Sequence, residues 1–64
     1  MLTVIHMPDG AKRDTFEIEL PVLPLVGELL YIDDVPYKVK KRDFNICNGR
    51  VFAVIYLKLG KQTM

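Results

Sequence analysis

The sequence lacks serine and tryptophan, and it has one histidine, His6, and one cysteine, Cys47. Without serine a Ser-His-Asp catalytic arrangement is impossible. A single cysteine excludes an intramolecular disulfide, and one Cys and one His fall short of the roughly four ligands of a structural zinc site. A Cys47–His6 nucleophile pair would have to join the ends of two different expected strands. We therefore expect no catalytic residue, no metal site and no cofactor, and we do not expect an enzyme.

Long hydrophobic runs are also missing. No apolar stretch approaches the roughly 18 residues needed to span a bilayer, and residues 1–10 lack the basic and apolar regions of a signal peptide. We therefore expect a cytoplasmic protein without a membrane partner. The 64 residues suffice for one domain, and a chain this short buries only about 60% of its unfolded surface. Because 50% of the residues are hydrophobic, self-association would add burial that the small core cannot supply.

Charge of neither sign dominates. Nine Lys and Arg residues stand against eight Asp and Glu residues, for a net charge of +1. Overall electrostatics therefore favour neither nucleic acid nor an anionic surface, and any such attraction must come from local clusters.

Turn residues divide the chain into short β-rich segments, and no window supports an amphipathic helix. The expected strands cover residues 2–7, 15–20, 28–33, 37–44 and 50–59. The first two should form a hairpin around loop 8–14. Two prolines make segment 21–28 an extended connection, with a turn at Gly27. We predict an all-β fold in which residues 1–64 form one small five-stranded SH3-like or OB-like barrel.

The last hairpin permits a prediction of register. Asn48-Gly49 is a strong signal for a two-residue type I′ turn, because both central positions need positive φ. The pairs next to such a turn are Cys47–Arg50, Ile46–Val51 and Phe44–Ala53. Continued unchanged, this register would place lysines opposite leucine and valine on the apolar face. One extra residue near Arg42-Asp43 restores the pattern, so we predict a β-bulge there. The pairs expected beyond the bulge are Val39–Leu57 and Tyr37–Leu59.

The middle of the chain contains a proline, a Val-Gly-Glu turn, an apolar strand, a polar turn and a Tyr-x-Val strand followed by basic residues. The residues concerned are Pro24, Val26, Gly27, Glu28, Ile32, Tyr37, Val39 and Arg42. This pattern, about a third of the chain, resembles small SH3-like β-barrel proteins encoded by phages and bacteria. The resemblance implies an SH3-like barrel and a phage or mobile-element origin. It also implies that the partner is a host protein whose activity this protein blocks. It implies no specific activity and assigns no site residue.

Residues 38–42 contain four cations in five positions. Small barrels bind single-stranded nucleic acid by combining such cations with aromatic stacking surfaces. The candidate nucleic-acid contacts are Lys38, Lys40, Lys41, Arg42 and Lys58, with Arg50 and Lys61 as neighbours and Tyr31, Phe52 and Tyr56 as stacking surfaces. The alternative is a solvated strand face whose lysines prevent edge-to-edge aggregation. Nearby acidic residues and the small net charge favour that alternative.

The fifth expected strand is apolar on both faces. Phe52, Val54 and Tyr56 lie on one face, opposite a second apolar row. Strands of this kind are usually covered on both sides. Either segment 21–28 and the N-terminal hairpin cover these three side chains, or they bind a protein partner or a second copy. The preferred hypothesis is a non-enzymatic protein-interaction module that uses Phe52, Val54 and Tyr56. The alternatives are a nucleic-acid-binding barrel and a structural subunit of a larger assembly.

Overall fold

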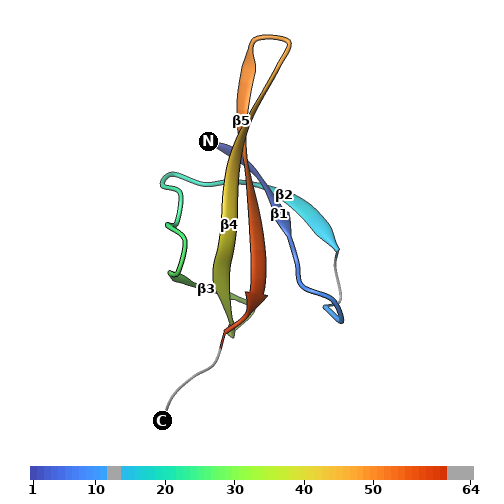
Figure 1. The fold of residues 1–64 in the computed structure, drawn as a ribbon, viewed down its shortest axis with the longest axis vertical. Helices are drawn as coiled ribbons and strands as arrows, with labels where there is room; N and C mark the ends of the chain where they lie inside the picture. Colours follow the sequence, from blue (N-terminus) through green and yellow to red (C-terminus); the bar gives the residue numbers. More distant parts are fainter. Residues whose placement is uncertain (12–13, 61–64) are drawn as a thin grey trace.

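The computed structural model describes residues 1–11 and 14–60, and these residues form five strands and no helix. The strands are β1 (Leu2–His6), β2 (Thr15–Glu19), β3 (Leu29–Ile32), β4 (Val35–Cys47) and β5 (Arg50–Leu59). They form one sheet in the order β2-β1-β5-β4-β3 (Figure 1). Neighbouring strands are antiparallel except β1 and β5, which are parallel. The all-β prediction is confirmed.

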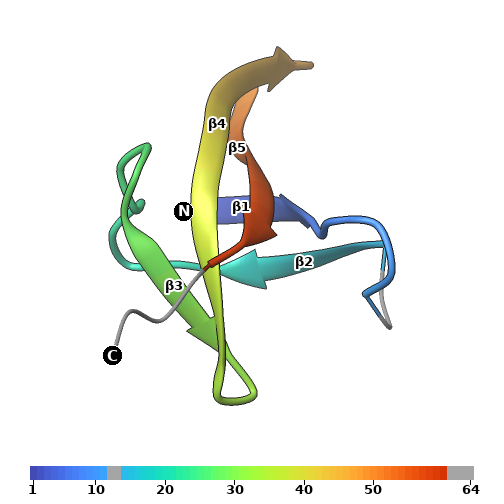
Figure 2. The same ribbon diagram turned by 60° about the horizontal axis from the view of Figure 1, so that its bottom comes forward.

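The sheet curls into a half barrel, with β2 and β3 as its two edges (Figure 2). This shape is compatible with the small SH3-like or OB-like barrel expected from the sequence. The curl brings together side chains from the concave face of β1, β4 and β5, which form the core. Its buried members are Ile5, Tyr37, Val39, Ile55 and Leu57. Partly buried apolar side chains from β2, β3 and the connections complete it: Met7, Phe16, Leu20, Leu23, Leu30 and Ile32.

Both tight hairpins use pairs of residues with positive φ. Asn48 and Gly49 have φ values of 51° and 75°, and Asp33 and Asp34 have values of 50° and 67°. Type I′ turns require this geometry at both central positions, and their twist matches that of the flanking strands. The predicted turn at Gly27 is also present. Gly27 has φ 93°, and the Glu28 amide donates a hydrogen bond to the Leu25 carbonyl at 3.0 Å.

The β4–β5 ladder confirms the predicted pairs on both sides of the bulge: Cys47–Arg50, Ile46–Val51, Phe44–Ala53, Val39–Leu57 and Tyr37–Leu59. The extra residue is Lys40, because Val39 pairs with Leu57 while Lys41 already pairs with Tyr56. The bulge therefore precedes Arg42-Asp43, which has a regular register. Positions 40–43 are all charged. The alternation of apolar residues on either side therefore showed that one extra residue was needed, but it did not show at which of these positions.

Candidate binding surfaces on the β4–β5 hairpin

The turn half of the β4–β5 hairpin extends beyond the rest of the sheet (Figure 1). We call residues 44–52 the arm. β1 pairs with β5 only from Ala53 to Tyr56, and β3 pairs with β4 only up to Lys38. Within the described chain, the two strands of the arm thus have only each other as ladder partners. The molecule is correspondingly elongated, with extents of 44 × 22 × 17 Å.

One face of the arm is apolar and exposed. Phe44, Ile46 and Val51 retain 54%, 76% and 49% of their accessible surface. They share this face because Ile46 pairs with Val51 and Phe44 pairs with Ala53. It is the continuation of the concave face, carried past the end of the core. The large apolar surface of the hairpin therefore lies on the side opposite to the predicted Phe52–Val54–Tyr56 row.

The Phe52–Val54–Tyr56 row lies on the convex face of β5. Val54 is only 5% exposed, whereas Phe52 and Tyr56 are partly buried. Val54 is flanked by Val4 of β1 and Asp43 of β4 at the same level of the sheet, and Tyr56 is flanked by His6. These three residues remain a predicted interface, of which Phe52 and Tyr56 offer the accessible part.

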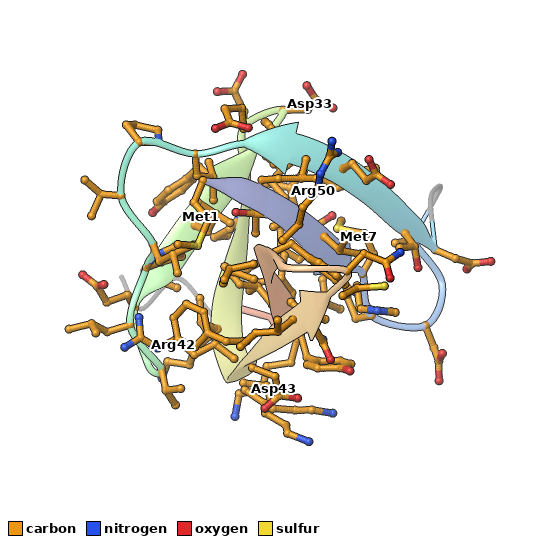
Figure 3. All side chains as sticks on the ribbon, turned by 90° about the horizontal axis from the view of Figure 1, so that it is seen from above. Met1, Met7, Asp33, Arg42, Asp43 and Arg50 are labelled. Carbon is orange, nitrogen blue, oxygen red and sulfur yellow. The ribbon has the colours of Figure 1, made fainter. Side chains whose placement is uncertain are left out.

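Arg42 separates from the other predicted nucleic-acid residues. Its guanidinium donates a hydrogen bond to the Pro24 carbonyl at 3.4 Å and lies 6.0 Å from the centre of the Phe44 ring. These contacts place Arg42 on the concave side, where the arm meets segment 21–28. Asp43, the next residue, points to a different side of β4 (Figure 3).

The lysines gather on the convex face. Lys38 and Lys58 are direct cross-strand partners. Lys41 Nζ lies 5.4 Å from the centre of the Tyr56 ring and 3.5 Å from Asp43 Oδ2. Lys40, the bulge residue, is exposed beside them. The structure therefore brings together four of the five predicted cations; Arg50 lies in the distant arm turn, and Lys61 lies outside the described residues.

A hollow of about 290 Å³ lies beside the bulge. Its lining residues come from the end of β1, the following loop, β4 and β5: His6, Met7, Pro8, Asp9, Lys40, Tyr56, Leu57 and Lys58. The rings of His6 and Tyr56 line one side of the hollow. They stack with centroids 4.7 Å apart and planes inclined by 12°. The stack forms because His6 and Tyr56 are direct partners on the parallel β1 and β5 strands. The sequence had given no signal for this ring stack, because the parallel pairing of β1 with β5 is a long-range feature.

A second hollow, of about 420 Å³, lies at the end of the half barrel away from the arm. It is bordered by the β1–β2 loop, β2 and the β3–β4 turn: Met7, Gly10, Ala11, Phe16, Ile32, Asp33, Val35 and Tyr37. Its lining is mainly apolar, with Asp33 as the ionisable carboxylate. Among residues 1–11 and 14–60, no three His, Cys, Asp or Glu side chains are placed to hold a metal ion. Cys47 lies beside the arm turn and His6 beside Tyr56, so the structure does not bring that pair together.

Together the fold and these surfaces define a small all-β protein with a projecting hairpin and a cationic convex face. Comparison of the chain with known protein families, with curated proteins and with solved structures finds no match. In the part of the chain that the structure describes, no helix has the length and apolar character needed to cross a membrane.

Proposed function

We propose that this protein is a non-enzymatic interaction module that binds another protein through the arm. The observation that carries the proposal is the exposure of Phe44, Ile46 and Val51 on one face of a projecting two-stranded ribbon. Contiguous exposed apolar side chains mark protein interaction sites, since leaving them in water costs free energy that a partner surface recovers. An isolated two-stranded hairpin is also only marginally stable, so a partner would order the arm as it binds.

The arm also offers backbone groups. Within residues 1–11 and 14–60, no third strand pairs with either outer edge of the arm. A partner segment can therefore add to the arm as a β-strand, while its apolar side chains meet Phe44 and Ile46. Arg42 at the base, beside the Phe44 ring, provides a cation at one end of this surface. The partner we propose thus presents an apolar strand or groove with a carboxylate at one end.

The proposal places this activity in the cytoplasm. Cys47 is a free, exposed cysteine in the arm, and the reducing cytosol keeps such thiols reduced. A host protein as the partner, suggested by the resemblance to phage-encoded barrels, remains part of the proposal.

Site-specific photo-crosslinking tests the arm. A photoreactive amino acid would replace Ile46, or Val22 as the control, because Val22 is equally exposed at 78% but lies in segment 21–28. A protein that is crosslinked from position 46 and not from position 22 would be identified and purified. Its binding to this chain would then be measured by titration calorimetry. We expect Ile46→Asp to weaken its binding by at least about tenfold, the effect of losing one well-buried apolar contact, and Val22→Asp to leave it unchanged. Equal loss from both variants would contradict the assignment of the arm.

Sedimentation equilibrium distinguishes a foreign partner from a second copy. A dimer that Ile46→Asp dissociates and Val22→Asp preserves would make the partner another copy of this chain. A larger assembly with the same sensitivity would make the protein a structural subunit. A monomer throughout leaves a foreign protein as the partner.

A further inference from the structure

The β-bulge determines which side chains reach the convex face. Along a regular strand, neighbouring side chains alternate between faces. Here Val39 is buried in the core and Arg42 contacts Pro24 on the concave side, so the face pattern is kept on both sides of the bulge. The extra residue therefore adds Lys40 next to Lys41 without moving an apolar side chain out of the core. Bulges are frequent beside binding sites because they redirect side chains in this way.

The charges on this face are not balanced. Lys41 has Asp43 as an ion-pair partner at 3.5 Å. Among the described residues, no carboxylate lies within ion-pair distance of Lys38, Lys40 or Lys58. Lys38 and Lys58 also face each other directly across the ladder, an arrangement that destabilises a sheet. An anion bound next to Lys58 would lower this cost.

The hollow beside the bulge gives such an anion a place. Lys40 and Lys58 line it from β4 and β5, and His6 and Tyr56 form a stacked wall. Its volume of about 290 Å³ is roughly that of ten water molecules, which is ample for a phosphate group. One carboxylate, that of Asp9, is among the lining residues, so the two lysines outnumber the acidic groups.

The Tyr56 ring is already occupied on both sides. β5 lies between β1 and β4, with His6 stacked from the β1 side and the Lys41 ammonium placed over the ring from β4. A nucleobase therefore has no free Tyr56 face on which to stack. Recognition at this hollow would rest on charge, which contributes affinity without base specificity.

We infer that this hollow binds a phosphate group, carried by a nucleic-acid strand or by a free nucleotide, with Lys40 and Lys58 as its ligands. Lysine ammonium groups act on phosphate as point charges and need no bidentate geometry. The inference is independent of the arm, since no residue of the hollow lies within positions 44–52.

Fluorescence anisotropy with a labelled single-stranded 12-mer at 50 and 200 mM salt tests the site. The variants are Lys40→Ala and Lys58→Ala, and the control is Arg50→Ala, which removes the same charge from the arm turn. We expect wild-type binding at the lower salt, weakened about fivefold or more by either lysine variant and within about twofold for the control. Each lysine variant should also lower the slope of log affinity against log salt by about 0.7, the contribution of one phosphate contact on a single strand.

Competition distinguishes the two sources of phosphate. Displacement of the 12-mer only by unlabelled oligonucleotide would assign the site to a nucleic-acid strand. Displacement by a mononucleotide or inorganic phosphate at similar concentration would assign it to a free phosphate compound. Absence of binding at 50 mM salt, together with no rise in the thermal midpoint on adding phosphate or a mononucleotide, would overturn the inference. Equal weakening by Arg50→Ala would overturn it too, because the attraction would then be unspecific. Both lysines are exposed, so we expect both variants to fold, and circular dichroism of each variant separates loss of binding from loss of folding.

Discussion

In both halves of the β4–β5 hairpin, apolar side chains alternate onto the same face of the ladder. The environments of these side chains are nevertheless opposite. In the half outside the arm, which we call the lower half (residues 35–43 and 53–59), Val39 and Ile55 are at most 1% exposed. They are covered by β1, β3 and the connections. In the arm, Ile46 on the same face of the same ladder is 76% exposed. Apolar alternation therefore identifies which side chains share a face, but it does not show whether another element covers that face.

The difference has a geometric origin. β4 has 13 residues and β5 has 10, whereas β1 and β2 have five each and β3 has four. The short strands end before the hairpin does, so the arm continues past them. The half of the hairpin outside the arm therefore contributes to the core, whereas the arm stays exposed.

Truncating one isoleucine in each half should give the largest difference. Ile55→Ala removes a side chain with 0% exposure and should lower the free energy of unfolding by about 2–4 kcal/mol, through lost burial and a cavity. Ile46→Ala, the same change at an exposed site, should cost less than about 0.5 kcal/mol. Urea unfolding followed by circular dichroism measures both. Similar losses would mean that the arm packs in solution against something the isolated fold does not show.

The arm should also open on its own. Gly49 has φ 75°, where an L side chain costs about 1 kcal/mol. Gly49→Ala should therefore speed amide hydrogen exchange in residues 44–52 by about fivefold, while exchange at Val39 and Ile55 stays close to wild type. Uniform acceleration throughout the sheet would show that the two halves unfold together.

The β3–β4 turn, which lies at the end of the sheet away from the arm, offers the opposite change. Asp34 has φ 67° without being glycine, and type I′ turns favour glycine after Asp or Asn. Asp34→Gly should raise the free energy of unfolding by about 0.5 kcal/mol, measured by thermal denaturation. A decrease would show that the Asp34 side chain contributes more to the turn than its backbone strain costs.

The smallest expected effect concerns the facing lysines. Lys58→Ala removes a like-charge pair from the ladder and should stabilise the fold by about 0.3 kcal/mol at low salt. The gain should shrink as salt screens the repulsion. Thermal midpoints at 20 and 500 mM salt give the comparison, and a destabilisation that is independent of salt would argue that the Lys58 stem packs against Tyr56.

Much of the fold was predictable from the sequence. Asn48-Gly49 determined the turn, the turn determined the nearby register, and the lysines at 38–41 signalled a cationic strand. The exact site of the bulge was not predictable, because charged residues at 40–43 tolerate several positions. The exposure of Phe44 and Ile46 was missed because it depends on where β1 and β3 end. The hydrogen bond from Arg42 to the Pro24 carbonyl was missed, because the two residues are far apart in sequence and segment 21–28 gave no sign of where it lies against β4.

By itself the sequence determined the all-β class, the turns and the pairing within the last hairpin, since these follow from side-chain alternation and from residues that tolerate positive φ. The tertiary structure decided what lies over each face. The parallel pairing of β1 with β5 placed His6 against Tyr56, the bulge placed Lys40 beside Lys58, and the short neighbouring strands left the arm uncovered. These outcomes depend on contacts between residues far apart in the chain, which local pattern does not encode.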